Sequence, residues 1–240
     1  MCTATVFATP FGYQLAFNRD ELLSRPSALP PAVREGLLMP RDPEGGGTWI
    51  ASNAQGLTVM ALNVYEAARQ EPTPPIRSRG LLVQDVACAA TLADVATFMH
   101  QPGLLAHTRP VHLLVVAPDA RTLDVHWDGE TLRLHDGRLP VLRVSAAIDP
   151  DAVRAARQQE FAQLTAEMAR TTDAAHTLRT WFSSHERHGA PRSVCMHWTP
   201  VAGTVSHTQV VVDQTHVTMR YVAGPPCEAG AETVVTMLRV

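Results

Sequence analysis

The chain contains no lysine: all 20 of its basic residues are arginine. This absence excludes mechanisms that need a lysine amine, such as Schiff-base chemistry, and it excludes a phosphate-binding loop of the Walker A type. No run of basic residues occurs, and the formal net charge is −3. The sequence therefore lacks the positive surface that nucleic-acid binding requires, and nucleic acid is not expected as a partner.

Cysteine is scarce, and long apolar runs are missing. The four cysteines are widely spaced and form no Cys-x-x-Cys pair, which predicts free thiols in a reducing compartment. No stretch of 18 or more apolar residues is present, so membrane insertion is not expected. Turn formers and charged residues interrupt the first 21 positions, which argues against a secretory signal peptide. These absences together predict a cytoplasmic protein.

The pattern of strands and helices predicts an α+β fold. With 240 residues, 45% of them apolar, the chain is expected to form one domain, residues 1–240, with a substantial core. Strand patterns alternate with helical ones, which favours two mainly antiparallel sheets stacked between helix layers, an αββα sandwich. The expected strands are Cys2–Ala8, Tyr13–Asn18, Thr48–Ser52, Leu57–Val64, a meander of His112–Ala117, Thr122–Trp127, Thr131–His135 and Val141–Ser145, and then Ser193–Trp198, Thr204–Asp213 and His216–Tyr221. The expected helices are Arg79–Ala89, Leu92–His100, one from Asp149-Pro150 to about Arg170, and Asp173–Ser184.

Two proline-rich stretches are expected to be irregular, at Arg25–Arg34 and Glu71–Pro75. Ser78 and Thr91 are expected to cap the first two helices.

Cys2 stands one residue from the start of the chain and leads directly into the first expected strand. Removal of Met1 would give Cys2 a free α-amine, with a reference pKa of about 7.7–8.0, beside a thiol of about 8.5. One residue would then supply both a nucleophile and a base. The simpler alternative is that a small residue follows Met1 only because processing favours it.

Two further segments contain residues that suit the same chemistry. Asn18-Arg19-Asp20-Glu21 ends the second strand: Arg19 would lower the pKa of a nearby thiol, and Asp20 would orient an α-ammonium group. Neighbouring residues of a strand point to opposite faces, so at most one of the two is expected to reach Cys2. Asn63 ends a later strand and has an amide N–H suited to an oxyanion. A solvated turn and an ordinary strand end are the alternative interpretations.

Eleven histidines raise the question of a metal. His185 and His188 form one pair and Cys195 and His197 another, but a zinc site needs three or four converging ligands. The sequence shows only pairs, so no metal site is expected. For haem, the candidate axial ligands are Cys2, His197 and His207, and nothing in the sequence selects among them.

Taken together, these N-terminal motifs resemble the NRDE-domain family, also called the transport-and-Golgi-organisation protein 2 family. The resemblance rests on Met1-Cys2-Thr3, residues 18–22 followed by Arg25-Pro26, residues 42–49, and residues 53–63. It is dense over about residues 1–65 and weak beyond. Eukaryotic relatives are linked to Golgi organisation and to the handling of haem and acyl lipids.

The chain is also similar, more distantly, to penicillin V acylases and choloylglycine hydrolases, which are N-terminal nucleophile hydrolases. That similarity implies an αββα sandwich with Cys2 as the nucleophile, Arg19 and Asp20 beside it, and Asn63 in the oxyanion hole. Two departures stand out: Arg19 and Asp20 are adjacent here rather than two residues apart, and residues 145–147 contain no asparagine. Arg192 and Arg220 are the candidates for the late arginine of the acylases. Asn18, Trp49 and Arg192 are expected to bind ligand.

Two functions follow from these resemblances. The first is cleavage of a non-peptide amide (C–N) bond in a small or acylated substrate, with no cofactor required. The second is a non-catalytic carrier of haem or a fatty-acyl ligand in intracellular trafficking. Both have a small-molecule amide, acyl or haem ligand as partner, and neither predicts an oligomeric state.

Overall fold

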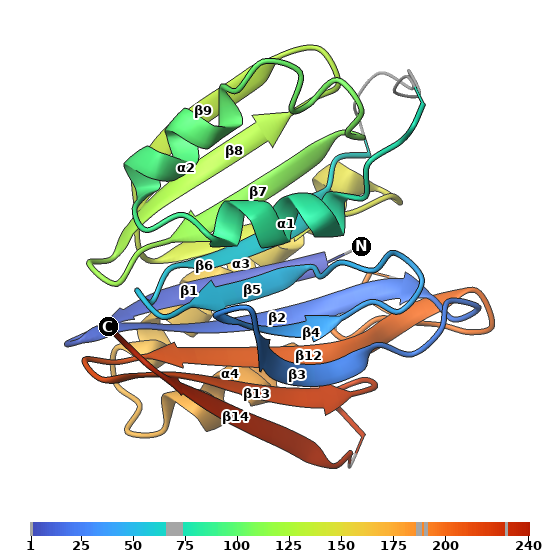
Figure 1. Ribbon diagram of the computed structural model, residues 1–240. Coiled ribbons are helices and arrows are strands. Elements are labelled where there is room, and N and C mark those ends of the chain that lie inside the picture. The colour runs from blue at the N-terminus through green and yellow to red at the C-terminus, as the bar shows by residue number, and fades with distance from the viewer. Residues whose placement is uncertain (1, 66–73, 186–188, 190–191, 229) are drawn as a thin grey trace.

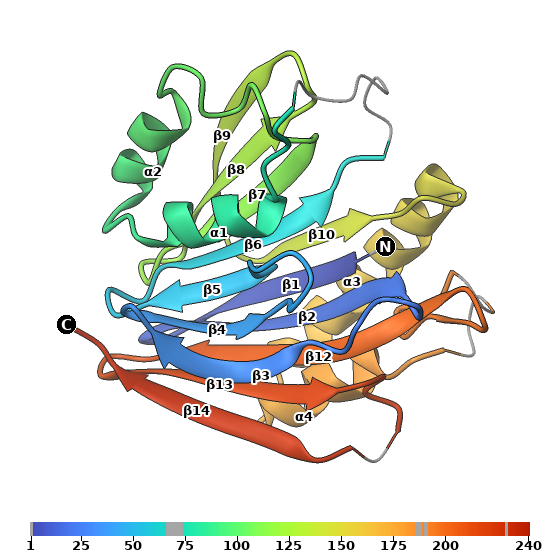
Figure 2. The ribbon, with the colours of Figure 1, turned by 45° about the vertical axis from the view of Figure 1, so that its right-hand side comes forward.

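The computed structural model describes residues 2–65, 74–185, 189, 192–228 and 230–240. Figures 1 and 2 show two β-sheets stacked face to face with helices on their outer faces, which confirms the expected αββα sandwich. Sheet A has the strand order β10-β1-β2-β12-β13-β14, with β11 paired to β12, and sheet B runs from β3 to β9 in chain order. None of the described helices has the length and apolar character that crossing a membrane requires.

The described strands and helices follow the expected order with shifted ends. Sheet A contains β1 (Cys2–Thr9), β2 (Gly12–Leu22), β10 (Val141–Ser145), β11 (His197–Trp198), β12 (Ala202–Val212), β13 (His216–Ala223) and β14 (Glu232–Leu238). Sheet B contains β3 (Leu29–Arg34), β4 (Leu37–Arg41), β5 (Ile50–Asn53), β6 (Thr58–Asn63), β7 (Val111–Val116), β8 (Arg121–Trp127) and β9 (Leu132–Arg138). The helices are α1 (Arg79–Ala87), α2 (Leu92–Met99), α3 (Pro150–Met168) and α4 (Ala174–Phe182).

Three apolar layers hold the sandwich together. Between the sheets, Leu15 and Phe17 of β2 pack with Met60 and Leu62 of β6. Ala16 lies between Leu15 and Phe17 in β2, so its side chain faces the opposite side of sheet A and packs in the apolar layer under α3 and α4. A third layer lies between sheet B and the helices α1 and α2. Each sheet is therefore covered on both faces over much of its area. A binding site can then form at the ends of the strands, which these layers do not cover.

The predicted helix caps are confirmed at two positions. Ser78 accepts a hydrogen bond from the backbone N–H of Gly80, and Thr91 forms a capping box with Asp94. Asp149 precedes α3 but makes no side-chain cap, because its carboxylate pairs with Arg192 at 2.6 Å. The N-terminus of α3 is instead favoured by Pro150, whose fixed φ suits the first turn.

Several sequence expectations were wrong in detail. Val141–Ser145 does not continue the meander of sheet B: it crosses to sheet A and pairs with β1. The expected irregular stretch Arg25–Arg34 contains β3, an edge strand, where prolines are tolerated because one side needs no ladder hydrogen bonds. Of the expected strand Ser193–Trp198, only His197–Trp198 pairs. The strands β4 and β14 were not anticipated, and most of the loop Glu71–Pro75 lies outside the described residues.

Candidate active site

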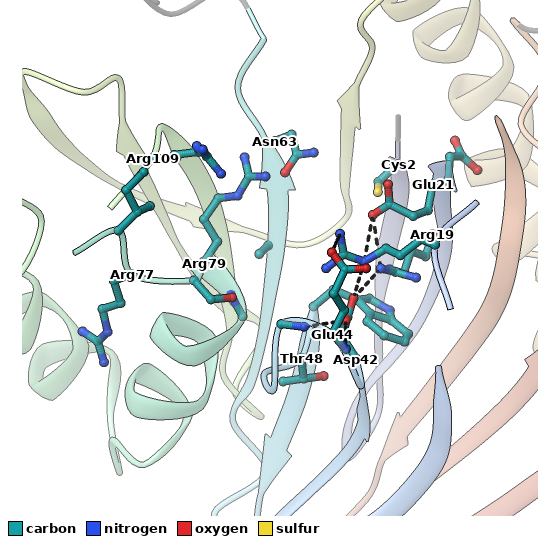
Figure 3. Close-up of a pocket in the computed structure, with 18 residues that line it drawn as sticks. Cys2, Arg19, Glu21, Asp42, Glu44, Thr48, Asn63, Arg77, Arg79 and Arg109 are labelled. Carbon is teal, nitrogen blue, oxygen red and sulfur yellow. Dashed lines mark hydrogen bonds and ion pairs between the residues drawn. The ribbon is translucent and has the colours of Figure 1, made fainter. Parts of the chain in front are cut away.

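A cavity of about 410 Å³ opens where β1 begins and where β2 and β6 end. Five residues singled out in the sequence line it: Cys2, Arg19, Asp20, Trp49 and Asn63. They come from three strands and from the loop before β5, so the fold brings together side chains up to 61 positions apart in the chain. Figure 3 shows Cys2, Arg19 and Glu21 on one side of this cavity and Asn63, Arg79 and Arg109 on the other.

Cys2 is the first residue of β1 and lies between two neighbouring strands of sheet A. It pairs with Arg19 of β2 on one side and with Ser145 of β10 on the other, and only 8% of its surface is exposed. The buried hydroxyl of Ser145 has no hydrogen-bond partner among the described residues. Burial raises the pKa of the Cys2 thiol, Asp20 raises it further, and Arg19 opposes this rise. The neutral thiol is therefore the resting form near pH 7, and a base is needed to activate it.

Arg19 is fixed from several directions at once. Its guanidinium donates to Asp42 at 2.8 Å and to Glu21 at 3.2 Å, and it lies 4.5 Å from the centre of the Trp49 ring. Burial of the guanidinium against two carboxylates and an aromatic face holds it in one orientation. The positive charge of Arg19 is therefore held in a fixed position beside the end of β1 that carries Cys2.

Asp42 anchors the glycine-rich loop that forms the floor of the cavity. Burial alone would raise the pKa of Asp42, but hydrogen bonds from Arg25 and from the backbone of Gly45 hold it below its usual value. Farther along this loop, a Cβ on Gly47 would lie 2.3 Å from the carbonyl carbon of Gly80 in the first turn of α1. Glycine is required at position 47 because the loop packs directly on the helix backbone.

Asp20 also lines the cavity, so both Arg19 and Asp20 are among its residues. The expectation that at most one of the two side chains reaches Cys2 stays a prediction, because it is the backbone of Asp20 that hydrogen-bonds the sulfur. A bulge in β12 between Thr204 and Ser206 lies opposite these two residues and locally disturbs the alternation of the pair. Thr204 donates its hydroxyl to Asp20 Oδ1 at 2.7 Å, whereas Oδ2 is buried without a hydrogen-bond partner among the described residues. Burial raises the pKa of Asp20 to about 6, despite the Thr204 hydrogen bond that lowers it.

Asn63 lies across the cavity, at the end of β6. In the view of Figure 3 its side chain lies between Arg79 and Cys2, and its amide donates to the hydroxyl of Tyr65 at 3.1 Å. Arg79 and Arg109 were not anticipated from the sequence. Burial lowers the pKa of Arg79, and the positive charge of Arg109 lowers it further. This wall of the cavity therefore carries concentrated positive charge.

Asn18 and His207 lie on the other face of sheet A, away from the cavity, so the expected ligand-binding role of Asn18 was wrong. The amide of Asn18 donates to the carbonyls of Phe182 and Val194 at 2.9 Å each, and its oxygen lies 2.8 Å from His207 Nδ1. Because strand residues alternate, Asn18 faces the α4 layer when Arg19 faces the cavity. Its role is to satisfy buried backbone groups beneath α4.

The two expected late arginines also lie elsewhere. Arg192 is exposed, and it pairs with Asp149 at 2.6 Å. Arg220 is exposed on β13, and it pairs with Glu232 at 2.9 Å. Neither lines the cavity, so the structure does not bring Arg192 to the residues around Cys2.

Arg157 of α3 lies close to β1 instead, and its side chain is completely buried. Its guanidinium donates to the hydroxyl of Thr3 and to the carbonyls of Ser193, at 2.8 Å, and Arg192, at 3.2 Å. Its charge also lowers the pKa of Asp20. Arg157 therefore links the start of β1 to α3 by hydrogen bonds. No pattern in the sequence indicates this burial, because a charged residue in a helix is ordinarily exposed.

The buried His207 predicts a loss of stability in acid. Burial lowers its pKa to about 3, so the folded protein keeps it neutral while the unfolded chain protonates near pH 6.5. The contribution of His207 to stability is complete above pH 6.5 and is lost as the pH falls toward 3, about 2 kcal/mol of it by pH 5. We expect His207→Gln to remove this dependence in urea unfolding at pH 7 and pH 5.

The matched control for this prediction is His135→Gln, an exposed histidine on β9. Asp20 titrates with the opposite sign: its raised pKa gives a contribution that is lost as the pH rises through about 6. Each variant is compared with the wild type at the same pH. The contribution of Asp20 then cancels, because all of these proteins contain it. An equal pH dependence in wild type and His207→Gln contradicts the prediction.

Comparison with solved structures shows the class of fold. A penicillin V acylase from Agrobacterium tumefaciens aligns with a TM-score of 0.58 and 12% identity, over 99% of this chain and 86% of the acylase. A mutant of the conjugated bile acid hydrolase from Clostridium perfringens aligns with a TM-score of 0.61 and 11% identity, over 99% and 92%. An N-acylethanolamine-hydrolyzing acid amidase ortholog from Caenorhabditis elegans aligns with a TM-score of 0.59 and 12% identity, over 88% and 92%. The chain therefore has the fold of the N-terminal nucleophile hydrolases.

At the level of sequence, the family model described as Transport and Golgi organisation 2 matches residues 1–116. This match confirms the resemblance that the N-terminal motifs indicated, and it extends the resemblance beyond residue 65 to the end of β7. A comparison with curated protein sequences found no match.

Proposed function

We propose that the protein is a hydrolase that cleaves a non-peptide amide bond with Cys2 as its nucleophile. The observation that carries this proposal is the convergence of Cys2, Arg19, Asp20 and Asn63 on one cavity. The fold neighbours support it, since they are named as an acylase, a hydrolase and an amidase. Each side chain in the group matches a requirement of amide cleavage.

The proposed reaction begins once Met1 has been removed. The α-amine of Cys2 accepts the thiol proton, and the thiolate attacks the carbonyl carbon of the amide. The Asn63 amide N–H stabilises the oxyanion, the C–N bond breaks, and the α-ammonium gives its proton to the departing amine. Water then attacks the thioester, with the α-amine as base, and releases a carboxylic acid and the free Cys2 thiol.

Asp20 supports this mechanism through its unused oxygen. Its Oδ2 atom is buried and lacks a hydrogen-bond partner among the described residues, which costs free energy unless a donor is supplied. The backbone of Asp20 hydrogen-bonds the Cys2 sulfur, so the carboxylate belongs to the residue that directly adjoins the nucleophile. An α-ammonium group on Cys2 is a donor of the right charge for this carboxylate.

The lining of the cavity favours a polar substrate over the carrier alternative. Of its 18 residues, five are arginines and four are carboxylates, and no histidine is among the described residues that line it. Trp49 and Ile76 are its large apolar side chains. A long acyl chain or a porphyrin ring would remove solvent from these charged side chains and place apolar surface against them instead. A small substrate with a polar or anionic acyl group fits the lining better.

Mass spectrometry tests the proposal directly. We expect the purified protein to lack Met1, and we expect a short reaction with a panel of N-acyl amines, quenched in acid, to leave one acyl group on Cys2 as a thioester. The matched control is Cys88→Ser, which removes an exposed thiol outside the cavity and is expected to acylate normally. Retention of Met1, or acylation that persists in Cys2→Ala, contradicts the proposal.

The pH dependence of kcat/KM tests the part played by Asp20. Only the carboxylate form holds an α-ammonium group, and burial raises the pKa of Asp20 to about 6. On top of the slope set by the α-amine, whose reference pKa is about 7.7–8.0, we therefore expect a limb in which kcat/KM falls a further tenfold or so per pH unit below 6. Asp20→Asn is expected to remove this limb, whereas Glu44→Gln, at a more exposed carboxylate of the same cavity, leaves it in place. A limb that is unchanged in Asp20→Asn rules out this role.

A further inference from the structure

A second cluster of side chains gathers at the edge of sheet A, outside the cavity. Cys195 Sγ lies 3.5 Å from Cys227 Sγ and 3.5 Å from His197 Nε2, and His197 Nε2 lies 3.2 Å from Cys227 Sγ. His185 lies beside this group: its ligand nitrogen, the ligand nitrogen of His197 and the sulfur of Cys227 all lie within 4.8 Å of one another. Three donor atoms therefore form a compact set, and the sulfur of Cys195 adjoins two of them.

We propose that these four side chains bind a structural zinc ion. Two cysteines and two histidines are a common donor set for structural zinc, because the metal is borderline soft and takes four ligands in a tetrahedron. Zinc bonds of about 2.3 Å to sulfur and 2.0–2.1 Å to nitrogen give tetrahedral edges of about 3.8 Å between sulfurs and 3.5 Å between sulfur and nitrogen. The three edges that join Cys195, His197 and Cys227 agree with these values to within about 0.3 Å.

A disulfide is the competing interpretation of the two neighbouring sulfurs. Their separation of 3.5 Å is far from the bonded length of about 2.05 Å, and both cysteines are free thiols. A disulfide would also not explain why the imidazoles of His185 and His197 lie beside these cysteines. The presence of two imidazoles favours the metal.

Surrounding hydrogen bonds hold the ligands in place, as expected for a metal site. His185 Nδ1 lies 3.2 Å from the carbonyl of Ser183, where it donates, so Nε2 is the nitrogen with the free lone pair. The backbone N–H of Cys195 donates to the carbonyl of Ser184 at 3.0 Å, and the hydroxyl of Ser193 donates to the carbonyl of His185 at 2.8 Å. The two segments that supply these ligands are therefore fastened together before any metal binds.

The position of the cluster indicates a structural role. His185 follows α4, Cys195 and His197 flank the start of β11, and Cys227 lies in the connection between β13 and β14. A bound zinc ion would join these three connections at one edge of the sandwich. Four protein ligands leave no open coordination position, so the site is not arranged for metal catalysis.

This proposal departs from the expectation of no metal site. In the sequence, Cys195 and His197 form only a pair, and Cys227 lies 30 residues beyond His197. The partners become visible only when β12 and β13 fold back and bring the connection after β13 beside β11. The hypothesis does not depend on the proposed hydrolase activity.

Metal analysis of the purified protein tests the site. The protein is reduced, incubated with Zn²⁺ and passed through a gel-filtration column before its metal content is measured. We expect one equivalent of zinc in the wild type, in Cys2→Ala and in the control Cys88→Ser. We expect loss of that equivalent in Cys227→Ser and in His197→Gln. Replacement by Co²⁺ is expected to give the visible bands of tetrahedral cobalt with thiolate charge transfer.

Thermal unfolding keeps the test valid if a variant folds poorly. A strong chelator is expected to lower the Tm of the wild type and to leave that of Cys227→Ser unchanged. Three results would overturn the proposal: no zinc retained by the reduced wild type, equal zinc in Cys227→Ser, or a Cys195–Cys227 disulfide in protein kept under reductant. Retention of zinc by Cys2→Ala together with loss of turnover would separate this site from the catalytic one.

Discussion

Replacing Cys2 with alanine is expected to lower kcat for an amide substrate by on the order of 10⁵-fold or more, because no other group at the site can form the thioester. Substrate affinity is expected to change little, since the side chain is small and contributes only one part of the cavity wall. Steady-state kinetics measure the first effect, and calorimetric titration with a substrate or its product measures the second.

The matched control for Cys2 is Cys88→Ala, which removes an exposed thiol at the end of α1. Its kcat and KM are expected to equal those of the wild type. Two results contradict the hydrolase hypothesis: turnover by Cys2→Ala within tenfold of wild type, or ligand binding by both proteins with no turnover by either. The second result would favour the carrier alternative, in which Cys2 is only part of a binding surface.

The N-terminal half of the site could be predicted because its residues are local in the chain. A short turn joins β1 to β2, so the hairpin places Arg19 directly across from Cys2 in the register of the two strands. Likewise β5 and β6 form a hairpin that ends at Asn63. Hairpin register follows from turn position and the alternation of apolar residues, and both can be read from sequence.

The expected role of Asn18 was wrong because alternation alone does not say which face of a strand carries the helices. In β2 both faces are buried, so neither face is marked as solvent by polar residues. Asn18 and Arg19 are both polar and both buried, yet one serves the α4 layer and the other the cavity. That assignment depends on how the two sheets and the helix layer stack, which is a property of the whole chain.

The residues contributed by the second half of the chain were missed for a different reason. Arg157 approaches β1 only because α3 crosses the outer face of sheet A, and Cys227 approaches Cys195 only through the return of β13. Contacts across 154 and 32 residues leave no periodic trace in the sequence. The exposed-face pattern of α3 also gives no warning that one of its arginines is buried.

Replacing Arg157 with methionine is expected to destabilise the protein by about 3–5 kcal/mol, as when one member of a buried, hydrogen-bonded charge cluster is removed. Methionine fills much of the same volume but donates no hydrogen bonds. The hydroxyl of Thr3 and the carbonyls of Arg192 and Ser193 would lose their buried donor, and Asp20 would lose a neighbouring positive charge. Urea unfolding at pH 7 measures the change in the free energy of unfolding.

Arg154→Met is the matched control, because Arg154 lies one turn earlier on α3 and is half-exposed beside Asp151. Its cost is expected to stay below about 1 kcal/mol, as for other surface ion pairs. A cost for Arg157→Met as small as that of the control would contradict a role in fastening β1 to the helix layer.

Arg157 also links the stability of the fold to the proposed chemistry. Since its charge lowers the pKa of Asp20, we expect the acid limb of kcat/KM in Arg157→Met to move to a pH above 6, with the limb of Arg154→Met unchanged. A merely structural arginine would lower the amount of folded enzyme without moving this limb. A shifted limb would therefore show that the charge behind sheet A acts on the carboxylate beside Cys2.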